Sequence, residues 1–336
     1  MKNRWRMVSK LTQYKVQNAY QIYRSFKASR KKGLSLMRGL PYSVSIEPTT
    51  ACNLRCPECP SGLRNFTRPT GNLNRNFFND FIQANHKHLI YLNFYFQGEP
   101  FIHKEFLDMV KIASQNQVFT STSTNAHFIN DSVSEKIVES GLDRLIISID
   151  GADQATYEQY RKEGKLEKVI AGTEAIVKAK RSFAQGPEII FQFLVVRPNE
   201  HQIEEIKALG KKLGVDNVVL KTAQIYDFEN GHPLIPENEQ YSRYSKDRRG
   251  KYRIKNPLDD QCWKMWHSCV ITWDGKVVPC CFDKDAKYSM GDLKEESLAS
   301  IWSSPKYNSF RNAILQSRSE IDICKNCSEG TKVWAD

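Results

Sequence analysis

Three cysteines near the N-terminus have a spacing that could hold an iron-sulfur cluster. Cys52, Cys56 and Cys59 form a C-x3-C-x2-C pattern directly after a short apolar run at residues 42–46. Three thiolates on one loop can hold three corners of a cubane cluster, which leaves the fourth iron without a protein ligand. A structural site normally closes its coordination with a fourth residue, so the incomplete set predicts a site for chemistry. A zinc knuckle or three unrelated buried thiols are the alternatives.

Four polar or turn-forming residues lie where later apolar runs end, and a fifth lies on the short helix after the fourth predicted strand: Gly98, Glu99, Asn125, Ser148 and, on the helix, Arg161. A carboxylate such as Glu99 suits a cationic amine, which has only hydrogen-bond donors. Arg161 can bind a carboxylate through two parallel hydrogen bonds. Asn125 and Asp150 can equally be interpreted as turn-capping side chains. A Gly-Glu-Pro turn is ordinary by itself, and it gains weight because it follows the cysteine triad by one strand.

Together, the triad and these turns resemble the motifs of the radical S-adenosylmethionine (radical SAM) enzymes. The run C-N-L-R-C-P-E-C is similar to the family's cluster loop, whose open iron chelates the amino and carboxylate groups of S-adenosylmethionine. Two positions depart from the family pattern. Glu58 stands where an aromatic residue is usual, and Gln97 replaces the first glycine of the Gly-Gly-Glu-Pro turn.

The resemblance implies roles for the five residues and a mechanism. Gly98 and Glu99 would hold the ammonium group of S-adenosylmethionine, Arg161 would pair with its carboxylate, and Ser148 would reach the cofactor. Asn125 stands where the family often has Thr-Asn-Gly. A 4Fe-4S cluster on the triad would pass an electron to S-adenosylmethionine, giving a 5′-deoxyadenosyl radical that abstracts hydrogen from an unactivated carbon. A flavodoxin- or ferredoxin-type donor would supply that electron.

Short β-rich runs alternate with helical patterns after Tyr42. The predicted strands cover residues 42–46, 89–96, 118–123, 144–149, 188–196 and 217–222. The predicted helices cover residues 75–86, 104–115, 132–140, 166–183 and 201–213. Strands separated by such helices pair in parallel through right-handed crossovers. Six units are too few for a closed eight-fold barrel, so we predict an α/β fold with a partial (β/α)6 barrel, as the resemblance also implies. The cluster loop would lie at the C-terminal ends of the strands.

Local signals refine this outline at two places. Ser132 with Glu135 predicts a capping box, and Gly141 predicts the end of the same helix. Residues 228–261 lack a sustained period and are predicted to be a linker, with one helix near 237–247. The predicted domains are therefore an extension at 1–40, a barrel at 41–227, the linker, and a cysteine-rich module at 262–336.

The N-terminal extension holds the whole charge excess. Residues 1–40 contain eleven Lys and Arg and no Asp or Glu, equal to the net charge of +11. Apolar residues recur there at helical spacing: Trp5, Val8, Thr12, Val16, Ala19, Ile22, Tyr23 and Phe26. The pattern predicts a basic amphipathic helix ending near Gly33. Docking on the barrel, binding an anionic membrane surface through residues 1–33, and binding a polyanion compete as its role, and nucleic acid is the least supported.

Six further cysteines make the C-terminal module a second candidate metal site. Four of them are predicted to converge: Cys262, Cys280, Cys324 and Cys327. Asp274-Gly275 predicts a tight hairpin turn, after which Cys280 would emerge from the returning strand. Cys269 and Cys281 are held in reserve, because Cys269 lies in mid-strand and Cys281 points away from Cys280 in an extended chain.

This module resembles the SPASM or shorter twitch extension of radical SAM enzymes, which holds auxiliary iron-sulfur clusters. Four ligands fit one auxiliary 4Fe-4S cluster. A four-cysteine zinc site is the rival, although a zinc ribbon usually shows two C-x2-C pairs. Asp283 is a candidate for taking a proton from the substrate, because some enzymes with this extension place a carboxylate near the corresponding cysteine. A solvated turn aspartate is the simpler interpretation.

Composition bounds the remaining possibilities. The 336 residues can bury a sizeable core, and 40% hydrophobic with 26% charged residues is ordinary for a globular protein. Nine cysteines without a signal peptide indicate reduced thiols of a cytoplasmic protein, peripheral at the membrane if the basic helix binds lipid. No apolar run approaches the ~20 residues that cross a bilayer.

An auxiliary cluster suits a two-electron oxidation, because it can accept the electron left on a substrate radical. We therefore predict a radical SAM oxidoreductase, in effect a dehydrogenase, acting on a sugar, an aminocyclitol or a glycan intermediate. Peptide or protein maturation is the alternative, although peptide-modifying relatives often carry a longer domain before the barrel. A zinc-stabilised binding protein with a basic arm is the non-enzymatic alternative.

Overall fold

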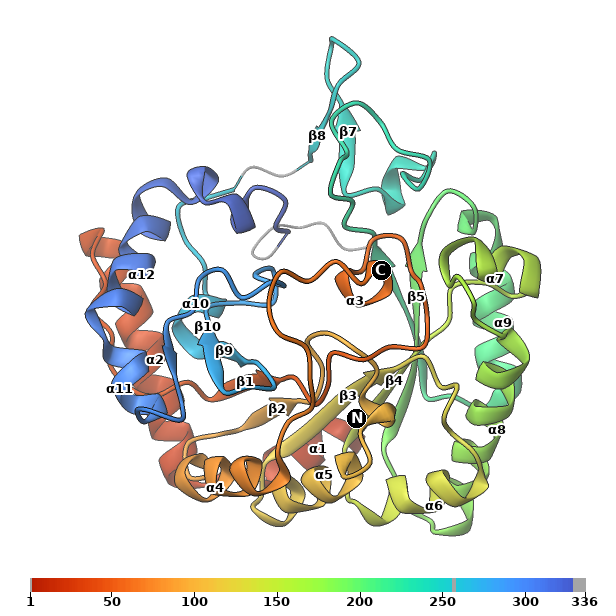
Figure 1. Ribbon diagram of the computed structural model, residues 1–336, viewed down its shortest axis with the longest axis horizontal. Helices are drawn as coiled ribbons and strands as arrows, with labels where there is room; N and C mark the ends of the chain where they lie inside the picture. The colour runs from red at the N-terminus through yellow and green to blue at the C-terminus, as the bar shows by residue number, and fades with distance from the viewer. Residues whose placement is uncertain (1, 256–257, 329–336) are drawn as a thin grey trace. The chain divides into compact units, whose positions relative to one another are not determined.

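The computed structural model describes residues 2–255 and 258–328 (Figure 1). The chain forms two compact units. Unit 1 contains residues 2–51, 66–121 and 258–328, and unit 2 contains residues 52–65 and 122–255. The fold is α/β, as expected, and the successive strands that alternate with helices pair in parallel, as a partial (β/α)6 barrel requires.

Unit 1 joins both ends of the chain in one sheet. Its strands, in their order across the sheet, are β11 (Gly291–Asp292), β10 (Lys276–Val278), β9 (Ser268–Ile271), β1 (Ser43–Ile46), β2 (Tyr91–Asn93) and β3 (Phe119–Thr124). β1 pairs in parallel with both β2 and β9, so that Ser43 faces Ser268. The expected hairpin is confirmed, because β9 and β10 are antiparallel and Gly275 between them has φ 91°.

The helices of unit 1 come from all three of its segments. They are α1 (Lys2–Ser9), α2 (Gln13–Lys32), α4 (Arg75–Asn85), α5 (Phe106–Gln115), α10 (Lys264–His267), α11 (Leu298–Ser303) and α12 (Pro305–Ser317). Single 3-10 turns are η1 (Pro100–Ile102), η4 (Arg318–Glu320) and η5 (Asp322–Cys324). Asn74 caps α4 by accepting hydrogen bonds from the backbone N–H groups of Asn76 and Phe77.

Unit 2 contains the later strands and their crossover helices. β4 (Arg144–Ser148), β5 (Glu188–Val195) and β6 (Asn217–Thr222) pair in parallel in that order. Its helices are α3 (Pro60–Leu63), α6 (Asp131–Glu139), α7 (Gln154–Tyr160), α8 (Leu166–Ser182) and α9 (Ile203–Leu213), with 3-10 turns η2 (Glu200–Gln202) and η3 (Glu239–Tyr241). All six predicted barrel strands are present, although the second is much shorter than predicted.

The predicted capping box of α6 is wrong. Asn130, rather than Ser132, is the N-cap, and its side-chain oxygen accepts a hydrogen bond from Val133 N. Asparagine is as good an N-cap as serine, so the helix begins at the earlier of the two signals. The expected glycine follows the helix, because Gly141 has φ 74°.

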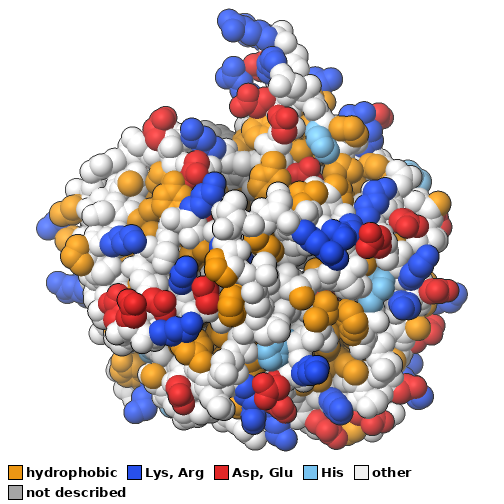
Figure 2. Space-filling view, viewed as in Figure 1, with side chains coloured by type: hydrophobic (Ala, Val, Ile, Leu, Met, Phe, Trp, Pro, Cys, Tyr) orange, Lys and Arg blue, Asp and Glu red, His pale blue; other side chains and the backbone are white. Residues whose placement is uncertain are grey.

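The predicted helix near residues 237–247 is also wrong. The segment contains η3 and then a two-stranded antiparallel sheet, β7 (Tyr244–Lys246) with β8 (Tyr252–Ile254). Asp247 accepts hydrogen bonds from Arg249 N and Lys251 N, and Gly250 has φ 76°, so the run Asp247–Gly250 closes a hairpin turn. Basic side chains gather at the hairpin tip (Figure 2).

The N-terminal extension forms two helices instead of one. α1 ends at Ser9, Thr12 caps α2, and Gly33 ends α2 with φ 64°, as expected. The buried face of α2 is mostly polar: Lys15, Asn18, Ile22, Ser25, Phe26 and Ser29. Trp5, Val8 and Val16, which were predicted to share the apolar face with Ile22 and Phe26, are exposed. No helix in the described residues has the length and apolarity to cross a bilayer.

Polar groups hold α2 on unit 1. Lys15 Nζ donates to the carbonyl oxygen of Gln117 at 2.5 Å, and Asn18 Nδ2 donates to Leu40 O at 2.8 Å. After the helix, Ser35 donates from its backbone and its hydroxyl to Asn312 and Asn308 of α12. Figure 1 shows α2 in red beside α12 in blue. The docking on the protein's own body that sequence suggested is therefore made by this polar face.

Buried Lys15 predicts an alkaline gain in stability. Burial, assisted by the charge of Lys10, lowers the pKa of Lys15 from 10.5 to about 8. Between these values the unfolded chain binds more protons than the folded one, so the free energy of unfolding rises as the pH rises from about 8 to about 10.5. Lys15→Met should remove this rise, worth about 1 kcal/mol after allowance for solvent screening.

The comparison is made by urea unfolding of the wild type and the Lys15→Met variant at pH 8 and pH 10. Other groups also titrate between pH 8 and pH 10. The effect of Lys15 is therefore the difference between the two proteins in how much the free energy of unfolding changes over this range. Equal pH dependence in both would show that Lys15 is not the group that titrates.

Candidate functional site

The three cysteines of the predicted cluster loop lie between β1 and α3. Cys56 is buried, and Cys52 and Cys59 are half-buried. Cys59 N donates to Cys56 O at 3.3 Å, and Cys59 is the N-cap of α3. All three pack against the same apolar cluster of unit 2, which includes Leu54 and Tyr160. The loop therefore places three thiols against apolar side chains.

Arg161, at the end of α7, reaches this loop. Its Nη1 lies 3.8 Å from Cys56 Sγ, and its Nε donates to Asp150 Oδ2 at 2.5 Å. The other Asp150 oxygen accepts from Leu194 N at 2.7 Å. Burial raises the pKa of Asp150, and the Arg161 guanidinium opposes that shift. Asp150, two residues after β4, thus holds Arg161 beside the triad, a role that sequence did not reveal because the two residues are separated by α7.

The Gly98-Glu99 turn follows β2 and packs closely against the segment before the triad. Glu99 N donates to Ala51 O at 2.7 Å, one residue before Cys52. Gly98 has φ 76°, and a Cβ there would collide with the backbone oxygens of Thr49 and Ala51. Glu99 is buried, and one carboxylate oxygen accepts from Phe101 N at 3.2 Å. Only glycine allows this approach of the turn to the chain.

Asn125 and Ser148 lie at the ends of β3 and β4. Asn125 Nδ2 donates to the side-chain oxygen of Asn53, in the cluster loop, at 2.8 Å. Its own oxygen accepts from His127 N at 3.1 Å, so Asn125 also caps a turn. Ser148 Oγ lies 3.3 Å from Ser123 Oγ. Within unit 2, Asn125 therefore contacts the cluster loop directly, and Ser148 is the last residue of β4.

Glu58, the departure from the family pattern, ties the cluster loop to the segment after β6. Glu58 Oε2 accepts a hydrogen bond from Tyr226 N at 2.9 Å, and Oε1 lies 3.7 Å from His232 Nε2. Burial, followed by the charges of Cys59 and Glu58, raises the pKa of Tyr226. The sequence showed only that Glu58 stands where an aromatic residue is usual. It could not show the contacts with Tyr226 and His232, because these residues are far from Glu58 in the chain.

The four cysteines predicted to hold the auxiliary cluster gather in unit 1. Cys262 precedes α10, Cys280 follows β10, Cys324 ends η5 and Cys327 follows it. Burial and then the nearby thiols of Cys281, Cys262 and Cys327 raise the pKa of Cys280 well above its ordinary value. Burial and then Cys327 raise the pKa of Cys324 to about 12. Each thiol therefore lies within electrostatic range of others in the set.

A buried guanidinium lies among these thiols. Arg318 is 2% exposed, and its Nη2 donates to Cys327 Sγ at 3.5 Å. Its Nη1 donates to Gln261 O at 2.8 Å, and its backbone N donates to Asp260 Oδ1 at 2.8 Å. A buried cation needs polar partners, and the Gln261 carbonyl oxygen and the Cys327 sulfur supply them. Sequence analysis missed Arg318, since nothing local marks an arginine in a polar stretch.

The reserve cysteines and Asp283 have other surroundings. Cys269 lies in β9 opposite Val44, and burial raises its pKa to about 12. Cys281 Sγ accepts from Lys264 Nζ at 3.7 Å. Asp283 is buried, contrary to the solvated turn residue expected, and its two oxygens accept from Lys287 N and Tyr288 N at 2.8 Å. Its carboxylate is occupied by its own turn, which gives it a structural role in this conformation.

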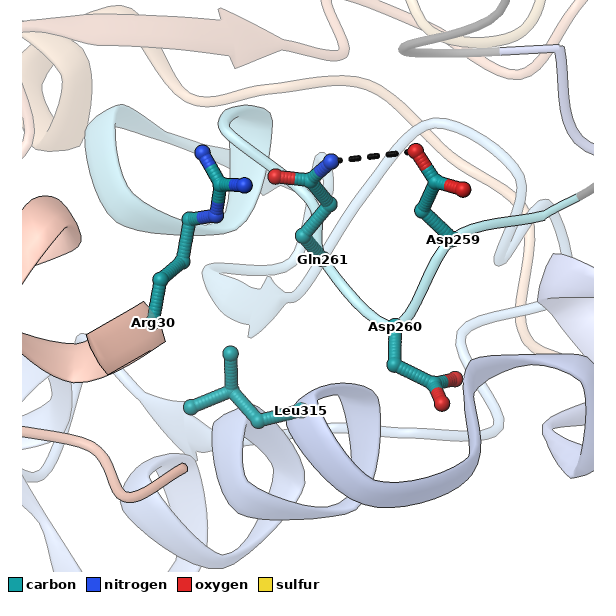
Figure 3. Close-up of a pocket in the computed structure, with 5 residues that line it drawn as sticks. All are labelled: Arg30, Asp259, Asp260, Gln261 and Leu315. Atoms are coloured by element: carbon teal, nitrogen blue, oxygen red, sulfur yellow. Dashed lines mark hydrogen bonds between the residues drawn. The ribbon is translucent and has the colours of Figure 1, made fainter. Parts of the chain in front are cut away.

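A cavity of ≈ 350 Å³ is lined in part by residues 259–261, which directly precede Cys262 in the chain (Figure 3). It is lined by Arg30, Asp259, Asp260, Gln261 and Leu315. Figure 3 shows Gln261 Nε2 donating to Asp259 Oδ2, at 3.1 Å. The lining is polar and contains none of the residues predicted to bind a cofactor, so this cavity is not the candidate catalytic centre.

Neither cysteine group has the geometry of a single bound ion. Within residues 2–255 and 258–328, no three Cys, His, Asp or Glu side chains converge as one metal ion would require. A cubane cluster has a different requirement, because each thiolate binds its own iron and the ligands stand apart around the cube. Three thiols grouped on one loop fit that requirement for the triad.

Two family models match separate parts of the chain. Residues 46–210 match the model of the radical SAM superfamily. Residues 262–328 match the model of SPASM, described as an iron-sulfur cluster-binding domain. These matches disagree with a zinc-stabilised binding protein, and they favour iron-sulfur over zinc at the C-terminal cysteines.

Individual relatives extend along most of the chain. A cofactor-modifying protein for tungsten-containing aldehyde ferredoxin oxidoreductase, from Pyrococcus furiosus, is 26% identical, covering 84% of this chain and 86% of its own. A PqqA peptide cyclase from Gluconobacter oxydans is 24% identical, covering 88% and 84% respectively. The structure of Streptococcus suis SuiB bound to S-adenosylmethionine superposes with a TM-score of 0.65 at 14% identity, covering 92% of this chain and 76% of SuiB.

Proposed function

Because this chain is a radical SAM enzyme with a C-terminal SPASM domain, we propose that it catalyses a two-electron oxidation of a small non-peptide substrate. The site would lie at the C-terminal ends of the barrel strands, beside the cysteine triad. The observation that carries the oxidation is the second thiol group, Cys262, Cys280, Cys324 and Cys327, of which Cys262, Cys324 and Cys327 lie near the buried cation of Arg318.

The cofactors are a 4Fe-4S cluster, S-adenosylmethionine and an auxiliary iron-sulfur cluster, as the two family domains imply. When bound, they supply a 5′-deoxyadenosyl radical that removes a hydrogen atom from the substrate. In our proposal Cys52, Cys56 and Cys59 hold the first cluster, and the C-terminal four hold the second. The three thiols on one loop, packed against one apolar cluster, support the first assignment.

The protein's own side chains would then bind and orient S-adenosylmethionine. Arg161 has a planar guanidinium beside Cys56 and is fixed in place by Asp150, so it is suited to a carboxylate at the open corner of the site. Glu99 provides a buried carboxylate for an ammonium group. Asn125 and Ser148 place polar groups at the C-terminal ends of β3 and β4. The apolar cluster behind the loop, which includes Tyr160, would exclude water from the reacting atoms.

The substrate class is inferred from the names of two relatives. The Pyrococcus relative is named as a cofactor-modifying protein, which favours a non-peptide substrate, and within that class we propose a sugar, an aminocyclitol or a glycan intermediate. The Gluconobacter relative is a peptide cyclase, and it makes peptide maturation the second candidate. We further propose a flavodoxin- or ferredoxin-type electron donor and a cytoplasmic location, in line with nine free cysteines.

Protease treatment of a cell extract separates the two substrate classes. The reconstituted enzyme is given S-adenosylmethionine, a reductant and the extract fraction below ~3 kDa, and 5′-deoxyadenosine is measured. We expect the fraction to increase 5′-deoxyadenosine formation, and the increase to survive exhaustive digestion of the fraction with a non-specific protease. The new product should be two mass units lighter than its precursor.

The matched control is the same digestion followed by addition of intact fraction, which shows that no inhibitor was created. Loss of the stimulation on digestion would replace the non-peptide proposal by peptide maturation. A product of unchanged mass would overturn the oxidation and leave the cofactor assignment intact.

A further inference from the structure

We propose that the outer face of α1 and α2 is a docking surface for an anionic lipid membrane. The surface is formed by exposed apolar and aromatic side chains followed by exposed basic ones. Of the thirteen exposed large apolar side chains in the described part of the chain, seven lie in this segment: Trp5, Val8, Leu11, Tyr14, Val16, Tyr20 and Tyr23. Scattered single residues of this kind need no explanation, but a concentration of more than half of them within residues 5–23 indicates an interaction site.

The docking of α2 explains why this face is free. The helix uses its polar side, including Lys15, Asn18 and Ser29, to bind unit 1. An ordinary surface helix buries its apolar stripe and exposes its polar side. Here much of the apolar stripe faces outward, and Trp5 is 72% exposed. Because α2 buries its polar side and exposes much of its apolar side, apolar surface remains available to a partner outside the chain.

One stripe on α2 combines the two kinds of side chain. Val16, Tyr20, Tyr23, Lys27 and Lys31 follow at intervals of three or four residues, so they share one helix face. The apolar residues Val16, Tyr20 and Tyr23 form the N-terminal part of this stripe, and Lys27 and Lys31 form its C-terminal part. Lys27 Nζ lies over the ring of Tyr23, 5.4 Å from its centre, so the first basic residue of the stripe contacts its last aromatic residue.

A lipid bilayer fits this chemistry better than other polyanions. Tryptophan and tyrosine are enriched at the membrane interface, and Lys and Arg are attracted to anionic headgroups. The segment 1–40 carries no acidic residue to oppose that attraction. Nucleic acid would use the basic residues, but aliphatic side chains such as Val8 and Leu11 would gain nothing from phosphate. Peripheral binding by an interfacial helix needs both kinds of residue, and both are present.

Co-sedimentation with lipid vesicles tests this surface on the full-length reconstituted enzyme. Vesicles of phosphatidylcholine alone are compared with vesicles of phosphatidylcholine and phosphatidylserine at about two to one. We expect the wild type to bind the mixed vesicles and to lose that binding at high salt. The double variants Lys27→Glu/Lys31→Glu and Val16→Gln/Tyr20→Gln should each weaken binding about tenfold.

Lys211→Glu/Lys212→Glu is the matched control, because it makes the same charge change at exposed positions of α9. It should bind vesicles like the wild type. Deleting the whole extension is avoided, since Ile22 and Phe26 are buried against the body. The proposal is overturned if the wild type ignores mixed vesicles, if the control weakens binding as much as the α2 variants, or if those variants abolish self-association or binding of a short DNA duplex without affecting vesicles.

Discussion

Replacing Cys52, Cys56 and Cys59 together by alanine is expected to remove about four of about eight irons per chain and to abolish cleavage of S-adenosylmethionine. The three thiols lie on one loop, and Arg161, whose Nη1 lies 3.8 Å from Cys56 Sγ, is proposed to hold the cofactor beside them. Without the thiolates no cluster can form there. Iron and acid-labile sulfide are measured after anaerobic reconstitution, and 5′-deoxyadenosine is measured with a reductant.

Two further variants make this result specific. Cys324→Ala/Cys327→Ala should also lose about four irons but keep basal cleavage of S-adenosylmethionine, since the triad is intact. Cys269→Ala should keep both, because Cys269 lies inside β9 and its pKa is affected by Arg311 and not by another cysteine. Only four irons in the wild type, all lost with the triad, would make the C-terminal group a zinc site. No iron in any variant would remove the proposed chemistry altogether.

Changing Asp150 to asparagine is expected to lower the free energy of unfolding by about 3 kcal/mol and to weaken binding of S-adenosylmethionine. Asparagine keeps an oxygen that can accept from Leu194 N, so the change removes mainly the negative charge. Arg161 would then be left as a buried cation beside Cys56 without its carboxylate partner. The measurements are urea unfolding of the cluster-free protein and equilibrium dialysis of the reconstituted one.

The pair Asp131–Lys178 offers the same substitution in a different setting. Both side chains are 74% exposed and their charged atoms are 3.5 Å apart. Asp131→Asn should cost less than about 0.5 kcal/mol, because water screens an exposed pair. If Asp150→Asn and Asp131→Asn lowered the free energy of unfolding by similar amounts, burial would not be the reason that the Asp150–Arg161 pair stabilises the fold.

The parts that sequence predicted well are those in which one local signal decides the structure. Gly275 and Gly33 mark a hairpin and a helix end, and both have the positive φ that the pattern predicts. The strand order follows from alternation of apolar runs, and the cysteine spacing placed Cys280 after a returning strand. In each case the physical cause lies within a few residues.

The parts that sequence did not predict depend on partners far along the chain. Periodicity showed that α2 has two faces, but not that the polar one would be buried, because Lys15 is satisfied by the carbonyl of Gln117. The contacts of Glu58 with Tyr226 and of Arg318 with Cys327 likewise need folded neighbours. The β7–β8 hairpin was missed because charged residues surround its turn.

The pairing of β1 with β9 sets an order for synthesis and folding. Ser43 faces Ser268, so β1 must wait for most of the chain to leave the ribosome before its second neighbour exists. Non-local pairing of this kind is slow, and an unpaired strand edge is a site of aggregation until it closes. The strands of unit 2 pair with close neighbours in the sequence and can form earlier. A chaperone that shields the early β1 edge would therefore matter more to the yield of this protein than its modest size suggests.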